Sequence, residues 1–524
     1  MPDKPESSTG SNQINQDIQG HSNQSIGQVY GGSLVVYVSG GQAIFNAPAT
    51  PAQPQPESSP SEGDNPYKGL AAFHESDSKR FFGRSQEINQ LWHDFRALHE
   101  TPSATRLLPI YGPSGSGKSS LARAGFISKL AHQPLPGREQ ARVAVIEPGL
   151  HPLQALATVL ARIAENDPTP ARKSREFAEE LAIPNRNHDF DGLQRVASVL
   201  PNIETFPLIV LVDQFEEVYS LCDASQESAQ RERDQFIATL LNAASDRSQD
   251  VSVIITFRSD FLGETHQHPV LNRLFSTQGF LVPTMDEMSL EAAIAQPAKA
   301  AGYALDPATT NLLIQQTVGR EGTLPLLQFA LTRIWENLPH EEPAQTLLKI
   351  GGVGGALADE AERIYARLSP TERAIAQRIF LGLIQLGEGT RDTRRRVEFN
   401  SLVAVAENPE QVQAVLQQFA DPGVRLLTLS SVKAAAQSTP TTTVEVTHEA
   451  LLEHWQRLKT WLNTGRDDLR FQQRLASAAK YWHEQRKDSG LVWRSPNLEL
   501  LEDFYQRTDS HSSPLKLTPL QLEF

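Results

Sequence analysis

The sequence has very little cysteine, no long apolar run and no excess of positive charge. Cys222 is the only cysteine in 524 residues, so no disulfide framework can form within one chain, and a reducing compartment is expected. Apolar runs such as PLIVLV fall well short of the ~20 residues that cross a bilayer. The polar start, MPDKPESSTGSNQ, lacks the basic and apolar regions of a signal peptide. We therefore expect a cytoplasmic protein with no membrane partner.

The net charge of -14 argues against nonspecific attraction to nucleic acid or to an anionic membrane. One basic cluster stands out, RDTRRRV at Arg391–Val397, and no aromatic residues are interleaved with it. This cluster could contact DNA, but a solvated surface is the favoured interpretation. Nucleic acid is therefore not among the expected partners.

Composition divides the chain into successive segments. Residues 46–64 hold five prolines and no large hydrophobic residue, which predicts an extended linker after a separate segment 1–45. Over 65–284, short apolar runs alternate with helical patterns, which predicts an α/β domain whose parallel strands are buried on both faces. The remaining segments are expected to be a helical domain at 285–350, a mixture of helices and a hairpin at 351–462, and further helices at 463–524.

A glycine-rich loop follows the first apolar run of this α/β domain. GPSGSGKS fits the pattern G-x-x-x-x-G-K-[ST], with the strand-like RLLPIY before it and the helical SLARAGFISKL after it. Such a loop wraps backbone N–H groups around a β-phosphate at the positive end of a helix. Lys118 would reach the β- and γ-phosphates, and Ser119 would offer its hydroxyl to Mg²⁺. The predicted nucleotide-binding residues here are Gly112, Pro113, Ser114, Gly115, Ser116, Gly117, Lys118, Ser119 and Ser120.

Two further strand ends carry charged residues. PLIVLVD places Asp213 at the carboxyl edge of the sheet, where a second Mg²⁺ ligand is required. Glu216 and Glu217 follow, and either could polarise the attacking water; Glu216 is preferred, and a solvated glutamate at a helix start is the alternative for each. Gln214 stands where many ATPase motors have an acidic residue, so slow turnover is expected. Arg258 ends VSVIITFR and could stabilise γ-phosphate charge, or pair with Asp260 on the surface.

The order of several motifs resembles the STAND NTPases, and more narrowly the bacterial novel STAND group. These motifs are FFGR, GPSGSGKS, LIVLVDQFEE, IITFRSDFL, LPLLQFAL and VEVTHEALLEHW, spread over roughly residues 65–465. The resemblance implies a P-loop NTPase sheet at 65–284, a helical lid at 285–350 and a winged-helix domain at 351–462. It also implies ATP or ADP with Mg²⁺ as ligands, and a C-terminal sensor, often of WD40 repeats, which we expect to be absent or truncated after the helical segment 463–524.

The same resemblance implies roles for residues outside the glycine-rich loop. Phe82, Gly83 and Arg84 would line the adenine side of the pocket, although Ser85 stands where relatives usually have glutamate. Pro325 would close the base pocket from the lid. His448 would reach the β-phosphate of ADP from the winged helix and hold the closed state, with a helix-cap or core histidine as the alternative.

The expected function is a signalling switch. ADP would keep the chain closed and monomeric, ATP would open it for self-assembly, and slow hydrolysis would act as a timer. A role in bacterial immunity or regulated cell death is one expectation from the resemblance. The alternatives are an ATP-driven motor that acts on DNA through the winged helix, and a nucleotide-bound scaffold that never hydrolyses.

The run QSIGQVYGGSLVVYVSGGQAIF, residues 24–45, has high β propensity and neither proline nor charge. Such a run can stack as cross-β, and it resembles the amyloid-signalling motifs at the N-termini of some STAND proteins. Clustered by assembly, it would recruit a downstream effector that shares a similar motif. A hairpin packed on the α/β domain, or disorder, is the alternative.

Overall fold

A computed structural model gives the fold of this chain. It describes residues 34–38, 43–46 and 65–524, with gaps at 137–140, 166–169, 187–188, 201–202, 204–205, 221–226, 247–250, 388–391, 405–407, 421–425, 433–440, 449, 486 and 509–516. Most of the N-terminal segment and the proline-rich linker after Asn46 therefore lie outside the described residues.

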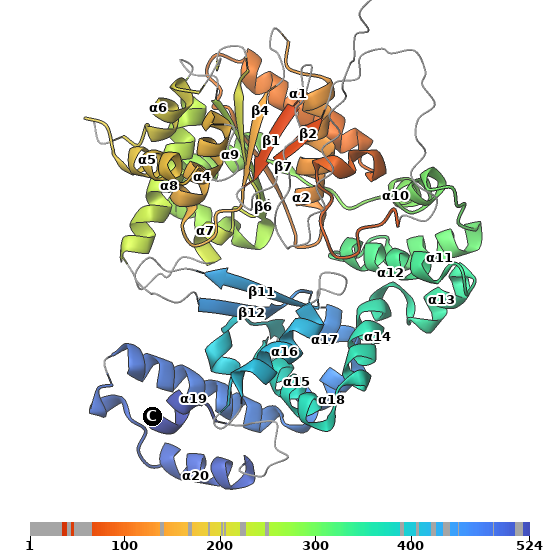
Figure 1. Cartoon of the computed structure of the whole chain (residues 1–524), viewed down its shortest axis with the longest axis vertical. Helices are drawn as coiled ribbons and strands as arrows, with labels where there is room; N and C mark the ends of the chain where they lie inside the picture. The colour runs from red at the N-terminus through yellow and green to blue at the C-terminus, as the bar shows by residue number, and fades with distance from the viewer. Residues whose placement is uncertain are drawn as a thin grey trace, which may run out of the picture.

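The predicted parallel sheet is present and lies in the upper half of the molecule (Figure 1). Seven strands run in the order β2-β1-β4-β5-β6-β3-β7, and the strands from β4 to β7 all pair in parallel. These five strands are β4 (Arg142–Ile146), β5 (Leu208–Val212), β6 (Val251–Arg258), β3 (Leu107–Gly112) and β7 (Phe280–Leu281). The α/β fold predicted from the apolar runs is thereby confirmed. The glycine-rich loop leaves β3, and β6 lies between β3 and β5.

Successive residues of the central strands face opposite sides of the sheet, and both sides are covered by helices. Val210 packs into one apolar cluster and Leu211 into the other, and both are fully buried. This arrangement explains why the strand sequences are continuously apolar rather than alternating. The helices are α4 (Pro152–Glu165), α5 (Ala171–Ala182), α6 (Gly192–Ser198), α8 (Glu227–Ser245) and α9 (Pro269–Gln278) on one face. On the other face lie α1 (Ser85–Glu100) and the continuous helical run α2 (Lys118–Ser120), η2 (Leu121–Ile127) and α3 (Ser128–His132).

Eight residues of the N-terminal segment are described, and together with Asn46 they form two strands at the edge of this sheet. Strand β1 (Leu34–Val38) pairs in parallel with β4, and β2 (Ala43–Asn46) pairs antiparallel with β1. The arrangement is the hairpin alternative, and the remaining residues of 24–45 lie outside the described part of the chain. Both edges of β1 are hydrogen-bonded in this arrangement.

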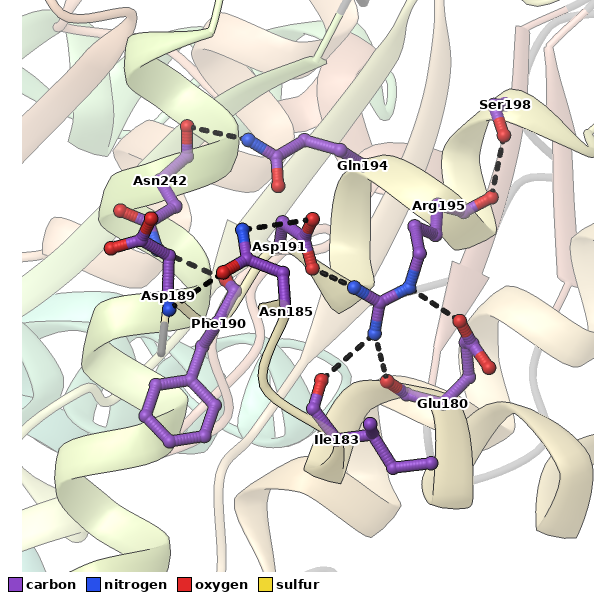
Figure 2. Close-up of polar contacts among 10 residues, drawn as sticks. All are labelled: Glu180, Ile183, Asn185, Asp189, Phe190, Asp191, Gln194, Arg195, Ser198 and Asn242. Carbon is purple, nitrogen blue, oxygen red and sulfur yellow. Dashed lines mark hydrogen bonds and ion pairs between the residues drawn. The ribbon is translucent and has the colours of Figure 1, made fainter. Parts of the chain in front are cut away.

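A polar network fixes the loop between α5 and α6 on the outer side of the sheet (Figure 2). The Arg195 guanidinium bonds the Glu180 and Asp191 carboxylates and donates to the carbonyls of Glu180 and Ile183 at 2.9 and 2.8 Å. Gln194 donates to the Asn242 carbonyl at 3.0 Å, which ties the start of α6 to α8. Since these bonds connect α5, α6 and α8, we assign the network a structural role.

The helical region predicted after residue 285 is present. Helix α10 (Glu287–Ala300) starts at Asp286, whose carboxylate accepts a 2.8 Å bond from the Ser289 N–H as an N-cap. The other helices of this region are α11 (Pro307–Thr317), α12 (Leu324–Asn337), α13 (Pro343–Lys349) and α14 (Gly352–Arg367).

The last region combines helices with a small antiparallel sheet in the order β10-β12-β11. Its strands include the predicted hairpin, β11 (Leu427–Val432) and β12 (Thr441–Val446), which lies below the large sheet in Figure 1. The remaining elements are α15 (Pro370–Gly382), β8 (Ile384–Gln385), β9 (Thr393–Arg394), β10 (Val397–Glu398), η4 (Phe399–Leu402), α16 (Pro409–Ala420), α17 (Ala450–His454), α18 (Gln456–Thr464), α19 (Arg466–Glu484), η5 (Ser489–Leu491), α20 (Asn497–Thr508) and α21 (Pro519–Glu523).

One apolar cluster joins this region to the preceding helices. It runs from Leu326 on α12 through Phe380 on α15 to Leu469 on α19 and Phe504 on α20. The two regions after residue 285 therefore share a core, and the helices after residue 463 pack onto it. Across the described ranges, none of the helices combines the length and the apolar composition that a bilayer crossing demands.

Candidate functional site

The glycine-rich loop forms a tight turn between β3 and α2. Gly115 and Gly117 have φ angles of +75° and +87°, a region that favours glycine because it has no Cβ. A Cβ on Gly115 would lie 2.9 Å from the Gly322 Cα, so the loop packs closely against the segment that precedes α12. Lys118 begins α2, and its Nζ donates to the Pro113 carbonyl at 2.8 Å. The loop therefore has the shape and the cation that phosphate binding needs.

Lys118 is buried, and burial lowers its pKa to about 8 even though nearby carboxylates, Glu216 first, act in the opposite direction. A buried cation with a lowered pKa gains stability from any anion placed beside it. The phosphates of a nucleotide are such anions.

Ser119 and Asp213 lie in contact. The Ser119 hydroxyl donates to Asp213 Oδ1 at 2.7 Å, and Thr256 Oγ1, near the end of β6, donates to the same oxygen at 2.6 Å. The strand order explains this contact, since β6 lies between the strands that carry the loop and Asp213. A hydroxyl and a carboxylate suit Mg²⁺, and the described residues contain no group of three or more acidic, His or Cys side chains placed to hold a metal ion. A bound Mg²⁺ would therefore complete its coordination with phosphate oxygens and water.

Glu216 and Glu217 point to different partners. Glu216 accepts a bond from the Arg258 N–H at 3.2 Å, and burial raises its pKa while Lys118 opposes that rise. Glu217 accepts from the Gly149 N–H at 3.0 Å, and burial raises its pKa to about 7. Glu216 is the carboxylate that shares the loop's electrostatic surroundings. Gln214, which follows Asp213, has a φ of 57° and donates its N–H to Thr256 Oγ1 at 2.9 Å.

Arg258 shows features of both interpretations. Its guanidinium pairs with the Asp260 carboxylate at Nε–Oδ1 3.2 Å and lies 5.5 Å from the Phe261 ring centroid. Arg258 nevertheless lines the cavity beside the loop. The Asp260 pair thus holds the arginine at the cavity wall.

The FFGR motif is split between two roles. Phe82 and Arg84 line the cavity, and the buried Arg84 guanidinium donates to the carbonyls of Pro283 and Ser116 at 2.9 and 3.2 Å. Arg84 therefore braces the loop from behind. Gly83, with φ +85°, packs on the lid helix α10, because an added Cβ would lie 2.3 Å from the Ser289 carbonyl oxygen.

One cavity of about 690 Å³ unites most of the predicted residues, and it is lined from three regions of the chain. Of the predicted residues, it is lined by Phe82, Arg84, Ser114, Gly115, Gly117, Lys118, Ser119, Ser120, Glu216, Glu217, Arg258 and Pro325. Pro113 and Ser116 face a second cavity of about 270 Å³ behind the loop. Of the described residues that were predicted, Gly83, Gly112, Asp213 and His448 line neither cavity.

Sequence reasoning missed two parts of the wall. Gly69–Phe73 line one end beside Phe81 and Phe82, and only their place at the start of the globular chain could have indicated them. Arg394, Arg396, Thr428, Glu445 and Thr447 line the cavity from the last region. Arg394 and Arg396 belong to the basic cluster for which a solvated surface was favoured; both line the cavity, and Arg396 is also exposed to solvent. The fold brings this segment to the cavity that the loop also lines, a long-range arrangement that the local charge pattern does not encode.

His448 lies one residue beyond this wall. Its ring Nε2 is 3.0 Å from the Gly322 carbonyl oxygen, and the Ala450 N–H donates to Nδ1 at 3.1 Å. Because Nδ1 accepts, the proton of the neutral ring is on Nε2, which donates to Gly322. His448 therefore touches the segment that packs on Gly115, and its predicted phosphate contact stays a prediction.

Comparison with known proteins gives one family. Residues 66–490 match the model of Novel STAND NTPase 1, and no curated protein matches the sequence. Among solved structures, the Orc1 protein of Aeropyrum pernix in complex with DNA is similar at 14% identity, covering 71% of this chain and 93% of that chain, with a TM-score of 0.35. The Drosophila ORC bound to DNA gives 13% identity, 79% and 95% coverage, and a TM-score of 0.35. Because the family match spans most of the chain, the protein belongs to the novel STAND NTPase 1 family.

Proposed function

We propose that this NTPase is a signalling switch controlled by the exchange of ADP for ATP. The observation that carries the proposal is the cavity of about 690 Å³, whose wall combines the glycine-rich loop, Pro325 on the lid helix and Thr447 beside β12. A nucleotide in this cavity would contact all three regions at once. Whether that nucleotide is ADP or ATP would then shift the equilibrium between the docked and open forms, provided that the two nucleotides bind these forms with different affinity.

Each residue of the loop edge has a role in this proposal. Lys118 binds the β- and γ-phosphates, and Ser119 and Asp213 would hold Mg²⁺, which would neutralise phosphate charge. Glu216 orients the attacking water, and Arg258 stabilises charge on the γ-phosphate. The position of Gln214 beside these groups fits slow turnover.

The contact between His448 and Gly322 supports coupling between the nucleotide and the last region. Gly322 packs on Gly115 of the phosphate-binding loop, and His448 donates to its carbonyl from the start of α17. A movement of the loop on exchange would therefore strain a hydrogen bond that joins the last region to the rest. In the winged-helix assignment, which we keep as part of the proposal, His448 is the latch of the closed state.

The proposed output is the N-terminal segment 24–45. Strand β1 is paired with β4 on one side and with β2 on the other, so both edges of β1 are occupied. Release and clustering of the segment in open, assembled chains would expose these edges for cross-β stacking with an effector that has a similar motif.

Light scattering of the full chain tests the switch. Glu216→Gln is used to block hydrolysis, and we expect a monomer with ADP and a larger assembly with ATP. The matched control, Lys118→Ala in the same background, should stay monomeric with both nucleotides. Equal masses with ADP and ATP would contradict the switch. ATP hydrolysis that rises steeply when duplex DNA is added would favour the motor alternative.

A further inference from the structure

We propose that Arg394 and Arg396 bind the nucleotide phosphates from across the cavity, and that Glu445 restrains Arg396. This inference rests on the proposed nucleotide binding and adds a second basic wall opposite Lys118. Neither arginine lies near the glycine-rich loop in the sequence, and the fold alone brings them to the cavity.

The first step of the argument is the alternation of the basic run. Arg394 ends β9, and Val397 begins β10, so Arg395 and Arg396 form a short link between two strands. Arg394 and Arg396 line the cavity, whereas Arg395, which the structure also describes, does not. The Arg395 N–H donates to the Leu383 carbonyl at 2.7 Å on the side of β8. Arg394 and Arg396 thus share the cavity side of this link, and Arg395 does not.

The neighbouring sheet shows the same alternation. Val444 and Val446 are fully buried in the apolar cluster, while Glu445 and Thr447 line the cavity. Glu445 of β12 and Thr447 just after it thus close the cavity on this side, and each bonds one of the two arginines. Arg394 Nη1 donates to the Thr447 carbonyl at 3.0 Å, and Arg396 donates to both Glu445 carboxylate oxygens at 2.8 and 3.2 Å.

Arg396 and Glu217 line the same cavity. Burial raises the pKa of the Glu217 carboxyl, and the Arg396 charge acts against that rise. Lys118 and Arg258 face the same space from the loop side. Guanidinium groups bind phosphate oxygens with strong, charge-assisted hydrogen bonds, and positive groups on two walls suit a polyanion between them.

The Glu445 carboxylate competes with phosphate for Arg396. In the structure this arginine is engaged through both carboxylate oxygens. A phosphate that takes Arg396 must break that pair, which makes nucleotide binding weaker than it would be with an unpaired guanidinium. Removal of the Glu445 charge should therefore strengthen binding, and loss of the arginines should weaken it.

Calorimetric titration of the full-length variants with ADP and ATP tests both directions. We expect the double variant Arg394→Ala and Arg396→Ala to bind each nucleotide about tenfold or more weakly, because two charge-assisted contacts are lost. Arg395→Gln, the control from the same run, should change affinity less than about twofold. Glu445→Gln should bind about threefold more tightly, since it keeps the shape and removes the competing charge.

Several outcomes would overturn the inference. They are unchanged affinity in the double variant, an equal loss with Arg395→Gln, or weaker or unchanged binding with Glu445→Gln. If thermal melting shows that the double variant is unfolded, Glu445→Gln decides alone. Failure of this inference is distinct from failure of the switch. Light scattering of the protein that keeps both arginines, with ADP and with ATP, measures self-assembly separately.

Discussion

Lys118 determines how nucleotide affinity should depend on pH. Its pKa is about 8 in the free protein, and phosphate contact raises it, so binding takes up a proton above pH 8. Affinity for ADP should be constant below that pH and then fall by up to about tenfold per pH unit. Affinity falls with rising pH because the protonated Lys118 ammonium is the form that binds phosphate. Titrations at several pH values measure this slope, and constant affinity from pH 7 to 9.5 would contradict the predicted role of Lys118.

The two adjacent glutamates should differ sharply when each is replaced by glutamine. Glu216→Gln should lower ATP hydrolysis by about 100-fold or more with little change in ATP affinity, as expected for a residue that activates water. Glu217 has a pKa of about 7, so it is partly neutral already, and Glu217→Gln should reduce hydrolysis only slightly. Single-turnover phosphate release compares the two variants. A larger loss with Glu217→Gln would reverse the assignment.

At the scale of elements, the contact of Gly83 with α10 should be important for stability. Gly83→Ala forces a Cβ to 2.3 Å from the Ser289 carbonyl oxygen at a φ of +85°. We expect a loss of about 3 kcal/mol in the free energy of unfolding, from strain and overpacking together. Urea unfolding followed by tryptophan fluorescence measures the change.

Gly302 supplies the matched control. Its φ is +87°, and no described atom lies within 4 Å of an added Cβ. Gly302→Ala should therefore lose only the backbone strain, about 1 kcal/mol. Equal losses in the two variants would show that the contact between FFGR and the lid helix contributes nothing.

The strands and the phosphate-binding loop could be predicted from the sequence because their signals are local. β5 is a run of apolar residues, and Gly112–Ser119 is a motif in one continuous stretch. The position of β6 between β3 and β5 could not be predicted, because strand order depends on packing over the whole domain. The contact of Thr256 with Asp213 was missed for that reason.

The segment 24–45 yields a prediction of its own at this scale. A peptide of residues 11–45 should form fibres with a ~4.7 Å cross-β spacing, because its β-rich part lacks charge and proline. Fibre diffraction tests this, and a peptide that stays monomeric at high concentration would remove the proposed output. The hairpin on β4 would then be the only role that the segment has in the described structure.

At the scale of the whole molecule, the site depends on contacts between distant parts of the chain. Gly69–Phe73 and Arg394 lie more than 300 residues apart in sequence and line one cavity. Neither carries a local motif, so their convergence follows only from the fold. The motif residues could be predicted, whereas the parts that would make the site responsive to domain movement could not.

The distance between the large sheet's domain and the last region tests the switch most directly. With Cys222→Ser, spin labels at Glu100→Cys on α1 and Gln456→Cys on α18 occupy exposed positions on the two parts. Double electron–electron resonance should give one narrow distance with ADP. With ATP in the Glu216→Gln background, we expect a longer and broader distribution. The same distribution with both nucleotides would contradict the proposal that nucleotide exchange opens this NTPase.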